Sequence, residues 1–280
     1  MDTKKPTQPE SHFRSAKADR KLLRDAVQTT QTRSNSYKLA FDDPDFLLRD
    51  ELRSVRLHLE FMKPGLVFDE QGVDSTIAVF GGARIPSPDG QPVRTDDPAL
   101  IKSLNDKAHF YEEARNFAKA VSRYSLDHGG RDWVICSGGG PGVMEAANRG
   151  ADDVGARSIG LNIVLPHEQA PNRYVTPELS LQFHYFAIRK MHFLQRARAL
   201  AVFPGGFGTL DEMFETMTLI QTKRIDPMPV LLFGRKFWNR IIDFDALAAE
   251  GTIAKADLDL FQFVETGAEG WAAIKQFYGL

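Results

Sequence analysis

Three short apolar runs in this sequence each end directly in a glycine-bearing turn. The turns read GGAR at residues 81–84, SGGGPG at 137–142 and PGGFGT at 204–209. Each leads into a polar loop or a helical pattern, so strands and helices alternate, as they do in a parallel sheet with helical connections. We therefore predict an α/β fold, a Rossmann-like three-layer domain in which helices flank a mostly parallel sheet.

The periodicity of apolar residues sets the expected elements of this domain. The chain has 280 residues, which is enough for one large domain with an appendage. A stretch at 85–98 contains four prolines and is predicted to be a surface loop. The predicted strands are 76–80, 133–135, 158–164, 200–203, 230–233 and 261–264, and the predicted helices are 106–125, 143–153, 183–198, 210–223, 238–248 and 269–278.

The amino-terminal residues differ in composition from the rest. Residues 1–40 hold nine Lys or Arg against four Asp or Glu and almost no aromatic residues, which predicts a mobile basic tail. Such a tail is either a solvated leader or an arm that binds an anionic surface or a partner. Residues 41–73 are predicted to be a helical extension, with one helix over 41–62 that ends before Pro64 and docks on the domain or a second subunit. The Rossmann-like domain is then 74–280.

Charge and apolar runs bear on the class of partner. The formal net charge is −2, which gives no reason to expect nucleic acid as a partner. No apolar run approaches the ~20 residues of a membrane span, and the first residues lack the apolar stretch of a secretory signal, so we expect a cytoplasmic protein with no membrane partner. The single cysteine, Cys136, is predicted to be buried at a strand end. Histidine spacing indicates no metal site.

The three turns are the candidate binding site. The carboxyl ends of parallel strands share one edge of a sheet, so the turns converge on one crevice. Backbone N–H groups beside a helix N-terminus suit a phosphate. The alternative is that the glycines only make tight turns. The candidate binding residues in the turns are Gly81, Arg84, Ser137, Gly138, Gly139, Gly140, Gly205, Gly206, Gly208 and Thr209.

Two familiar nucleotide motifs are absent from these turns. A P-loop needs Gly-Lys followed by Ser or Thr, which none of the turns contains, and this speaks against a triphosphate. The dinucleotide fingerprint needs a third glycine where Val143 stands and an acidic residue near 164–166, where the chain reads VLP. These two failures leave a nucleoside monophosphate as the best fit.

Two carboxylates follow the third turn. Thr209 and Glu212 match a capping box, in which Glu212 would bond the Thr209 N–H. Glu212 is also placed one turn into a helix whose N-terminus faces the predicted phosphate, so it is a candidate for chemistry. Glu215 lies on the same face and is either a second cleft carboxylate or a paired surface charge.

A basic pair, Arg189 and Lys190, lies within an aromatic stretch of the preceding helix. The Arg189 guanidinium suits a phosphate or a ribose edge. The alternative is that both side chains lie on the surface and form only weak ion pairs. The aromatic residues around it, Phe183, Tyr185, Phe186 and Phe193, are predicted to be core more than a stack for a nucleobase.

These residues resemble a known family. VFPGGFGTLDE at 202–212 is similar to the PGGxGTxxE signature of the LOG family, the cytokinin riboside 5'-monophosphate phosphoribohydrolases. FGGAR at 80–84, SGGGPGVMEAANRGA at 137–151 and the Arg189-Lys190 pair lie in the family's order. Members have often been labelled lysine decarboxylases, but the chain shows no pyridoxal phosphate site, and we regard that label as mistaken.

The resemblance implies hydrolysis of the N-glycosidic bond of a nucleoside 5'-monophosphate to a free base and ribose 5-phosphate. It implies that the PGGxGT turn receives the phosphate and that Arg189 and Glu212 are catalytic, with Glu145, Lys190 and Glu215 among the substrate-binding residues. No cofactor is implied. Family members form dimers or larger rings, so we expect a homo-oligomer.

This chain departs from the short plant-like form of the family. It carries residues 1–73 in addition, and its second turn reads GPGVMEAANRG, as in longer bacterial members. The base of the substrate is therefore either adenine or an N6-modified adenine, and the sequence does not distinguish the two. The alternative function is a non-catalytic protein of the same superfamily that binds a nucleotide or the molybdenum cofactor.

Overall fold

The computed structural model describes residues 13–90, 95–166 and 170–280. Its contacts divide the chain into two units, Met1–Leu59 and Glu60–Leu280, and the division falls inside helix α3 (Arg53–Glu70). In the first unit, α1 (Ala16–Arg24) and α2 (Pro44–Leu47) contain no buried residue. The helix predicted over 41–62 is replaced here by α2, a 3₁₀ turn at Asp50–Leu52 and the start of α3.

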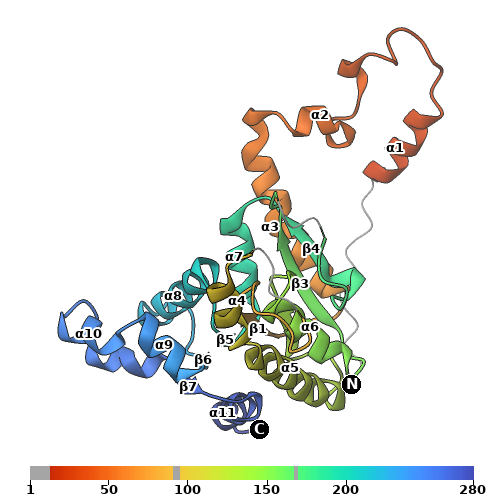
Figure 1. Cartoon of the computed structure of the whole chain (residues 1–280). Helices are drawn as coiled ribbons and strands as arrows, with labels where there is room; N and C mark the ends of the chain where they lie inside the picture. Colours follow the sequence, from red (N-terminus) through yellow and green to blue (C-terminus); the bar gives the residue numbers. More distant parts are fainter. Residues whose placement is uncertain (1–12, 91–94, 167–169) are drawn as a thin grey trace. The chain divides into compact units, whose positions relative to one another are not determined.

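The second unit is built on a parallel sheet. Its described residues form seven strands in the order β4-β3-β2-β1-β5-β6-β7, and every neighbouring pair is parallel. This arrangement confirms the α/β, Rossmann-like fold (Figure 1). The strands are β1 (Thr76–Phe80), β2 (Val134–Ser137), β3 (Ser158–Ile163), β4 (Ser180–Phe183), β5 (Ala197–Val202), β6 (Val230–Phe233) and β7 (Gln262–Val264).

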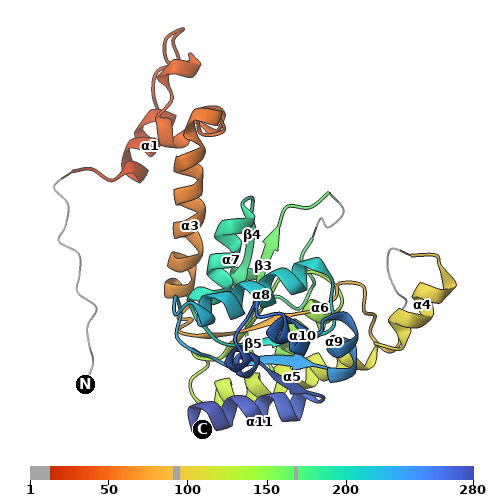
Figure 2. The same cartoon turned by 90° about the vertical axis from the view of Figure 1, so that its left-hand side faces the viewer.

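Helices cover both faces of the sheet. Side chains alternate along β1, so Ile77 and Val79 enter one core cluster whereas Ala78 and Phe80 enter the other. Figure 2 shows α7 and α8 on one side and α5 and α11 on the other. The predicted burial of Cys136 on β2 is confirmed. The helices of this unit after α3 are α4 (Pro98–Asn105), α5 (His109–Asp127), α6 (Val143–Asp152), α7 (Phe186–Gln195), α8 (Phe207–Gln221), α9 (Arg235–Ile241), α10 (Phe244–Ala249) and α11 (Gly267–Tyr278).

Two predicted helices differ from the structure, and two short elements were not predicted. β4 was not predicted, because it has four residues and one of its side chains, Gln182, is exposed; the helix expected from residue 183 therefore begins only at Phe186. The helix expected over 238–248 is two helices. Asp243 separates them, since its carboxylate accepts the Ala246 N–H at 2.9 Å and starts α10. Helix α4 begins at Pro98, the last residue of the predicted loop, and otherwise covers residues 99–105, for which no element was predicted.

Helix α3 continues through Pro64, where the sequence predicts its end. Proline inside a helix removes one hydrogen bond and costs about 3 kcal/mol. Here Pro64 is buried and Phe68, one turn further, is 2% exposed in the core. Burying a phenylalanine is worth about 1.5–3 kcal/mol, so packing on the sheet offsets the lost bond.

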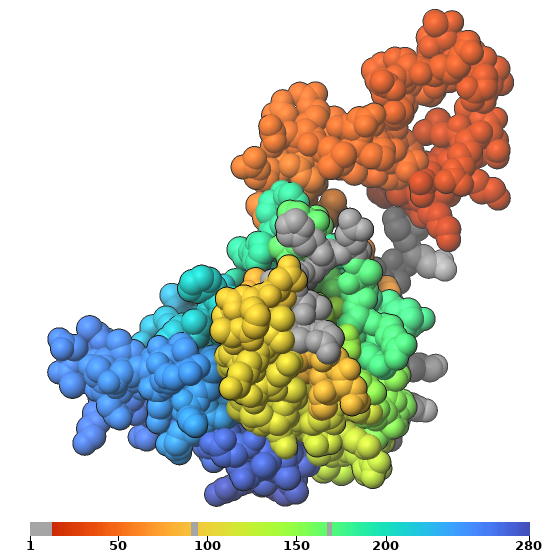
Figure 3. Space-filling view, in the orientation of Figure 1, coloured from red at the N-terminus to blue at the C-terminus, as the bar shows by residue number. Residues whose placement is uncertain are grey.

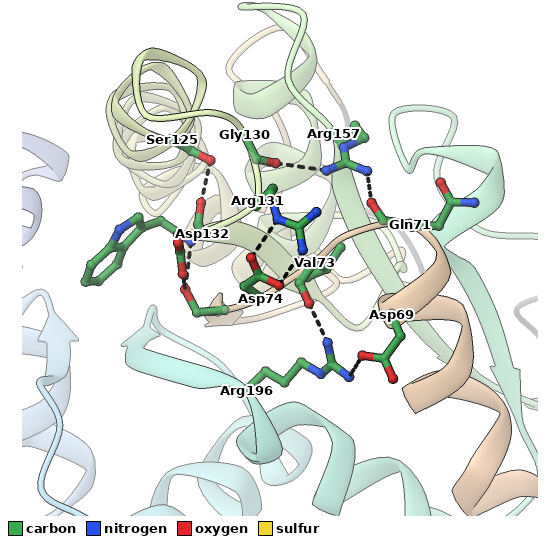
Figure 4. Close-up of polar contacts among 12 residues, drawn as sticks. Asp69, Gln71, Val73, Asp74, Ser125, Gly130, Arg131, Asp132, Arg157 and Arg196 are labelled. Carbon is green, nitrogen blue, oxygen red and sulfur yellow. Dashed lines mark hydrogen bonds and ion pairs between the residues drawn. The ribbon is translucent and has the colours of Figure 1, made fainter. Parts of the chain in front are cut away.

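The amino-terminal edge of the sheet is closed by arginine side chains (Figure 4). Arg157 donates to the Gln71 and Gly130 carbonyl oxygens at 2.5 and 2.9 Å. Arg196 donates to the Val73 carbonyl and pairs with Asp69. These bonds fasten the segment between α3 and β1 to the strands beside it. The opposite edge, where the glycine turns emerge, carries the open cavity described next.

Within the described residues, α-helices that are both long and apolar enough to cross a membrane are absent.

Candidate active site

A cavity of about 290 Å³ lies at the carboxyl ends of the strands. Its walls come from the turns after β1 and β2, the ends of β3 and β4, helix α7 and the start of α8. The strand order changes direction between β1 and β5, and such a switch point is where parallel α/β sheets bind ligands. The predicted residues that line this cavity are Gly81, Gly138, Arg189, Gly206, Gly208, Thr209 and Glu212.

Four other predicted residues line neighbouring cavities. Arg84 and Gly205 lie in a second cavity, of about 480 Å³, which shares Gly206 and Gly208 with the first. Helices α4 and α9, whose surroundings lie close together in Figure 3, supply Leu104 and Phe237 to this cavity. Lys190 and Glu215 line a third cavity, of about 820 Å³.

The remaining predicted residues are engaged inside the protein. Ser137 is fully buried; its hydroxyl donates to Asn148 Oδ1 at 2.7 Å and accepts the Gly139 N–H at 3.0 Å. Glu145 accepts a hydrogen bond from the Tyr111 hydroxyl at 2.8 Å. The Gly140 carbonyl accepts from Asn172 Nδ2 at 3.1 Å. These contacts shape the second turn from behind the cavity wall.

Helix α8 begins earlier than its sequence pattern suggests. Its first residue is Phe207 and its N-cap is Gly206, which makes Thr209 the third helical residue. The Thr209 N–H donates to the Gly206 carbonyl at 3.0 Å, so it is not the partner of Glu212 and the capping-box interpretation is wrong. The early start follows from packing: a Cβ on Gly205 would lie 2.1 Å from Thr209 Oγ1, so glycine lets the turn close on the threonine.

The α8 N-terminus offers donors to the cavity. The first N–H groups of a helix have no acceptor within the helix, and together with the helix dipole they favour an anion. Gly206 and Gly208 both line the cavity, and a Cβ on either would meet only open space. An oxyanion could therefore approach this backbone closely.

Glu212 places a carboxylate in the same cavity. The residue is 4% exposed, and its Oε2 has no hydrogen-bond partner among the residues the structure describes. Burial raises the pKa of the Glu212 carboxyl, Lys190 opposes the rise, Glu215 adds to it, and the pKa settles at about 7. A carboxyl that titrates near neutrality beside a cavity is suited to proton transfer.

Arg189 faces the cavity from α7. Its Nε donates to the Leu161 carbonyl at 2.7 Å, and the guanidinium lies over the Phe193 ring at 5.0 Å. A Cβ on Gly138 would lie 2.7 Å from Arg189 Nη2, so the glycine leaves room for the guanidinium. Its charge lowers the pKa of Glu212, and the two side chains belong to one electrostatic site.

Lys190 links the two helices that carry these residues. Its ammonium lies 3.0 Å from Asp211 Oδ1 and 2.9 Å from Glu215 Oε2. Burial lowers the Lys190 pKa, but the hydrogen bonds to Glu215 and Asp211 outweigh it and the pKa is raised. The Lys190 side chain is only 17% exposed, so the interpretation of Arg189 and Lys190 as an exposed pair is wrong.

The aromatic residues around the basic pair divide into two sets. Phe183 and Phe193 are buried in the core, as predicted. Phe186 is 54% exposed and lines the cavity, where an aromatic ring offers a face to a flat ligand.

Two amide side chains that line the cavity were not among the predicted site residues. Asn162 and Gln182 lie in register on β3 and β4 and both line the cavity. Asn162 Nδ2 donates to the carbonyls of Gly160 and Leu181, each at 3.2 Å. A polar residue near the end of an apolar run is a signal for Asn162. Gln182 has no such signal, because its strand was itself not foreseen.

Comparison with known proteins gives one family. The model of the family described as "Possible lysine decarboxylase" matches residues 144–274. The chain is 25% identical over 182 residues to the probable cytokinin riboside 5'-monophosphate phosphoribohydrolase LOG4 of Oryza sativa subsp. japonica, which covers 64% of this chain and 75% of the relative. It is 25% identical over 170 residues to the cytokinin riboside 5'-monophosphate phosphoribohydrolase LOG3 of Arabidopsis thaliana, covering 60% and 75%.

Solved structures resemble the chain more distantly. The molybdenum cofactor binding protein of Rippkaea orientalis is 17% identical with a TM-score of 0.47, covering 73% of this chain and 98% of its own. The molybdenum cofactor carrier protein of Chlamydomonas reinhardtii is 17% identical with a TM-score of 0.45, covering 74% and 99%. Neither ligand nor activity follows from a likeness of this size.

The family model and the curated relatives agree with the signature at 202–212 and the parallel α/β fold. Over these regions the chain is similar to LOG-family proteins.

Proposed function

We propose that the protein hydrolyses the N-glycosidic bond of a nucleoside 5'-monophosphate, AMP or an N6-modified AMP, to the free base and ribose 5-phosphate. One observation carries this proposal: the buried Glu212 carboxylate, with an oxygen that no described residue bonds, shares its cavity with the α8 N-terminus. An anion anchor and a carboxylate are what a phosphorylated glycoside needs. The curated relatives are named for the same reaction.

The phosphate is assigned to the start of α8. N–H groups of the first helical turn, free of side-chain bulk at Gly206 and Gly208, bind its oxygens. Binding energy from this remote group holds the sugar in place for reaction. Gly81 and Gly138 give the substrate room along the turns beside it. Ser137 and Glu145 support the cavity wall from behind.

The reaction is assigned to Glu212. As the C1'–N bond breaks, its electron pair leaves with the base and positive charge develops on the ribose ring. The ionised Glu212 carboxylate stabilises this charge and accepts a proton from the attacking water. The water hydroxyl joins C1', and the proton passes through Glu212 or solvent to the base nitrogen, so that neutral base and ribose 5-phosphate result.

Arg189 and the apolar wall of the cavity receive the rest of the substrate. The guanidinium is a planar multiple donor that suits ribose hydroxyls or the departing base. Met144, Ile163 and Phe186 provide apolar surface for a base, and Asn162 and Gln182 provide amide groups for its edge. An apolar wall also tolerates an apolar N6 substituent, which leaves AMP and N6-modified AMP as the two substrates to compare.

The test is a panel of nucleoside monophosphates with chromatographic detection of base and ribose 5-phosphate. Purified protein should cleave AMP or N6-isopentenyl AMP, adenosine without phosphate should be far poorer, and Glu212→Gln should bind AMP without cleaving it. A folded protein that cleaves no monophosphate overturns the proposal. Tight binding without turnover, measured by calorimetry, would instead indicate a carrier of a nucleotide or of the molybdenum cofactor.

A homo-oligomer is part of this proposal. Phe186 and Met191 on α7 are 54% and 52% exposed, and exposed apolar side chains on one helix suit a contact with a second copy. Light scattering coupled to size exclusion should give a mass of at least two chains; a monomer at micromolar concentration would contradict it.

A further inference from the structure

We propose that Glu60 is a positioning residue for Arg189, acting through the first turn of α7. The proposal rests on the function proposed above, in which Arg189 contacts the substrate. Glu60 belongs to α3, before the first strand of the sheet, and lies outside every motif of the sequence analysis. Residues 60–70 of α3 run beside α7 (Figure 2).

The Glu60 carboxylate closes the amino end of α7. Its Oε1 accepts the Tyr185 N–H at 2.8 Å and its Oε2 accepts the His184 N–H at 3.0 Å. Both oxygens are used, and both donors directly precede the first helical residue, Phe186. Hydrogen bonds to an ionised carboxylate are roughly twice as strong as those between neutral groups.

The residues at the start of α7 provide no capping side chain of their own. Its N-cap residue, Tyr185, makes no side-chain capping bond, and the first turn holds no acidic residue. A helix N-terminus normally carries Ser, Thr, Asp or Asn as a cap, or a nearby anion. Glu60 is therefore the cap of α7, supplied from a helix more than 120 positions away in the chain.

Tyr185 connects this cap to Arg189. The Tyr185 N–H is held by Glu60, and the Tyr185 carbonyl accepts the Arg189 N–H at 3.1 Å. The arginine side chain then spans to the Leu161 carbonyl on β3. A shift of the first turn of α7 consequently moves the guanidinium relative to Gly138 and Glu212, which belong to other elements.

A second set of contacts fastens the far end of α7 and serves as the comparison. His192 Nε2 lies 2.9 Å from the Phe61 carbonyl, and Arg196, just after the helix, pairs with Asp69 at 2.8 Å. Asp69 thus joins the same two segments as Glu60 does, but at the end away from Arg189. If the α3 contacts only stabilised the fold, substitutions at Glu60 and Asp69 would have the same kind of effect.

The experiment compares Glu60→Gln with Asp69→Asn in the full-length protein. Glutamine keeps the size of Glu60 but turns an amide N–H₂ toward one of the two N–H donors. We expect kcat for AMP to fall about ten- to a hundredfold, as misplacement of a catalytic group does, while the affinity for ribose 5-phosphate changes less than twofold. Asp69→Asn should lower the urea midpoint and leave kcat within about twofold.

A double-mutant cycle with Arg189→Lys gives the second readout. If Glu60 acts through Arg189, Glu60→Gln should lower kcat much less in the Arg189→Lys background than in the wild type, because its target is already altered. Equal fold-losses in both backgrounds would overturn the proposal, and so would an equal loss of kcat in Asp69→Asn.

Failure of this proposal differs from failure of the proposed function. A wild-type protein that cleaves AMP, but whose Glu60 and Arg189 effects are additive, contradicts only the positioning role. If the wild type binds AMP without cleaving it, the proposed function fails. The double-mutant cycle can then still be carried out, with the dissociation constant of AMP measured in place of kcat. A wild type that neither cleaves nor binds a monophosphate overturns both.

Discussion

The Lys190 ammonium lies 3.0 Å from Asp211 Oδ1 and thereby joins α7 to α8. The next residue back on α7 is Arg189 and the next residue forward on α8 is Glu212, and both line the cavity. One ion pair, with Asp211 at the wall of the 290 Å³ cavity and Lys190 in the neighbouring one, thus links the two helices that carry the candidate catalytic side chains. Its charges also act on Glu212, since Lys190 lowers the Glu212 pKa and Asp211 raises it.

Removing the Lys190 charge should shift the pH dependence of the reaction. Glu212 must be ionised to act on water, so kcat/KM should rise with pH through about 7 in the wild type. In Lys190→Met the Glu212 pKa rises further, and the acid limb of the profile should move to higher pH. Asp211→Asn removes a negative charge near Glu212, so it should move the acid limb of the profile to lower pH. Shifts of one sign in both variants would contradict this electrostatic account.

Glu212→Gln should abolish activity and stabilise the fold. The raised pKa means that the folded protein binds more protons than the unfolded chain between about 4.5 and 7, so this residue lowers stability as pH rises through that interval. Above pH 7 the uncharged glutamine escapes a penalty of up to about 3 kcal/mol. Urea unfolding at pH 8 and pH 5 measures the difference in free energy of unfolding between the variant and the wild type. The stabilisation of the variant should be smaller at pH 5.

Glu215→Gln is the matched control for that measurement. It removes a carboxylate one turn along the same helix that pairs with Lys190, so it should not stabilise the protein. A gain of equal size in both variants would mean that general charge repulsion, and not the burial of Glu212, is responsible.

The sequence predicts the parts of this fold that depend on local pattern. β1 and β6 match their predicted bounds, Thr76–Phe80 and Val230–Phe233, because buried parallel strands read as continuous apolar runs bounded by turn residues. The crevice was predictable too, since three glycine turns that follow parallel strands must share an edge. Gly81, Gly138 and Gly206 accordingly meet at one cavity.

Close packing within a turn and contacts between distant segments could not be predicted. Thr209 followed by Glu212 has the pattern of a capping box, and only the packing of Thr209 on Gly205 moves the start of α8 back to Phe207. The bonds from Glu60 to His184 and Tyr185 leave no local pattern in the sequence. Where two segments far apart in the chain supply each other's hydrogen bonds, propensity and periodicity carry no information about the pairing.

Arg157 should be important for stability and unimportant for catalysis. Its guanidinium donates hydrogen bonds to the Gln71 and Gly130 carbonyl oxygens at the edge of the sheet opposite the cavity. Arg157→Met leaves both carbonyls without this donor and should lower the free energy of unfolding by about 2–3 kcal/mol, as for hydrogen bonds to charged groups. Urea denaturation measures the loss, and kcat for AMP should not change.

Arg131→Met provides the comparison for Arg157. Arg131 pairs with Asp74, and the two side chains are 58% and 49% exposed, so the loss should be about 1 kcal/mol or less, as for surface pairs. Equal losses of unfolding free energy in the two variants would show that the hydrogen bonds from Arg157 to the carbonyls stabilise the fold no more than an exposed ion pair does.

Gly206→Asp should improve the fold while weakening substrate binding. Gly206 is the N-cap of α8, in an extended conformation and with open space where a Cβ would stand, so aspartate fits there as a cap. A capping carboxylate beside the helix dipole should add up to about 1 kcal/mol to the free energy of unfolding. The same charge would repel a phosphate at the α8 N-terminus. Unit charges about 4 Å apart interact by about 4 kcal/mol at a protein surface, so the affinity for ribose 5-phosphate should fall at least a hundredfold.

Gly206→Asn separates the charge from the bulk of the new side chain. Asparagine has nearly the same shape and caps equally well, so it should keep most of the ribose 5-phosphate affinity measured by calorimetry. If aspartate and asparagine weaken binding equally, size is responsible and the charge argument fails. If aspartate leaves the affinity unchanged, the phosphate does not bind at the start of α8, and the anchor must be sought at the second cavity, where Arg84 and Lys107 lie. The two variants therefore locate the anion directly.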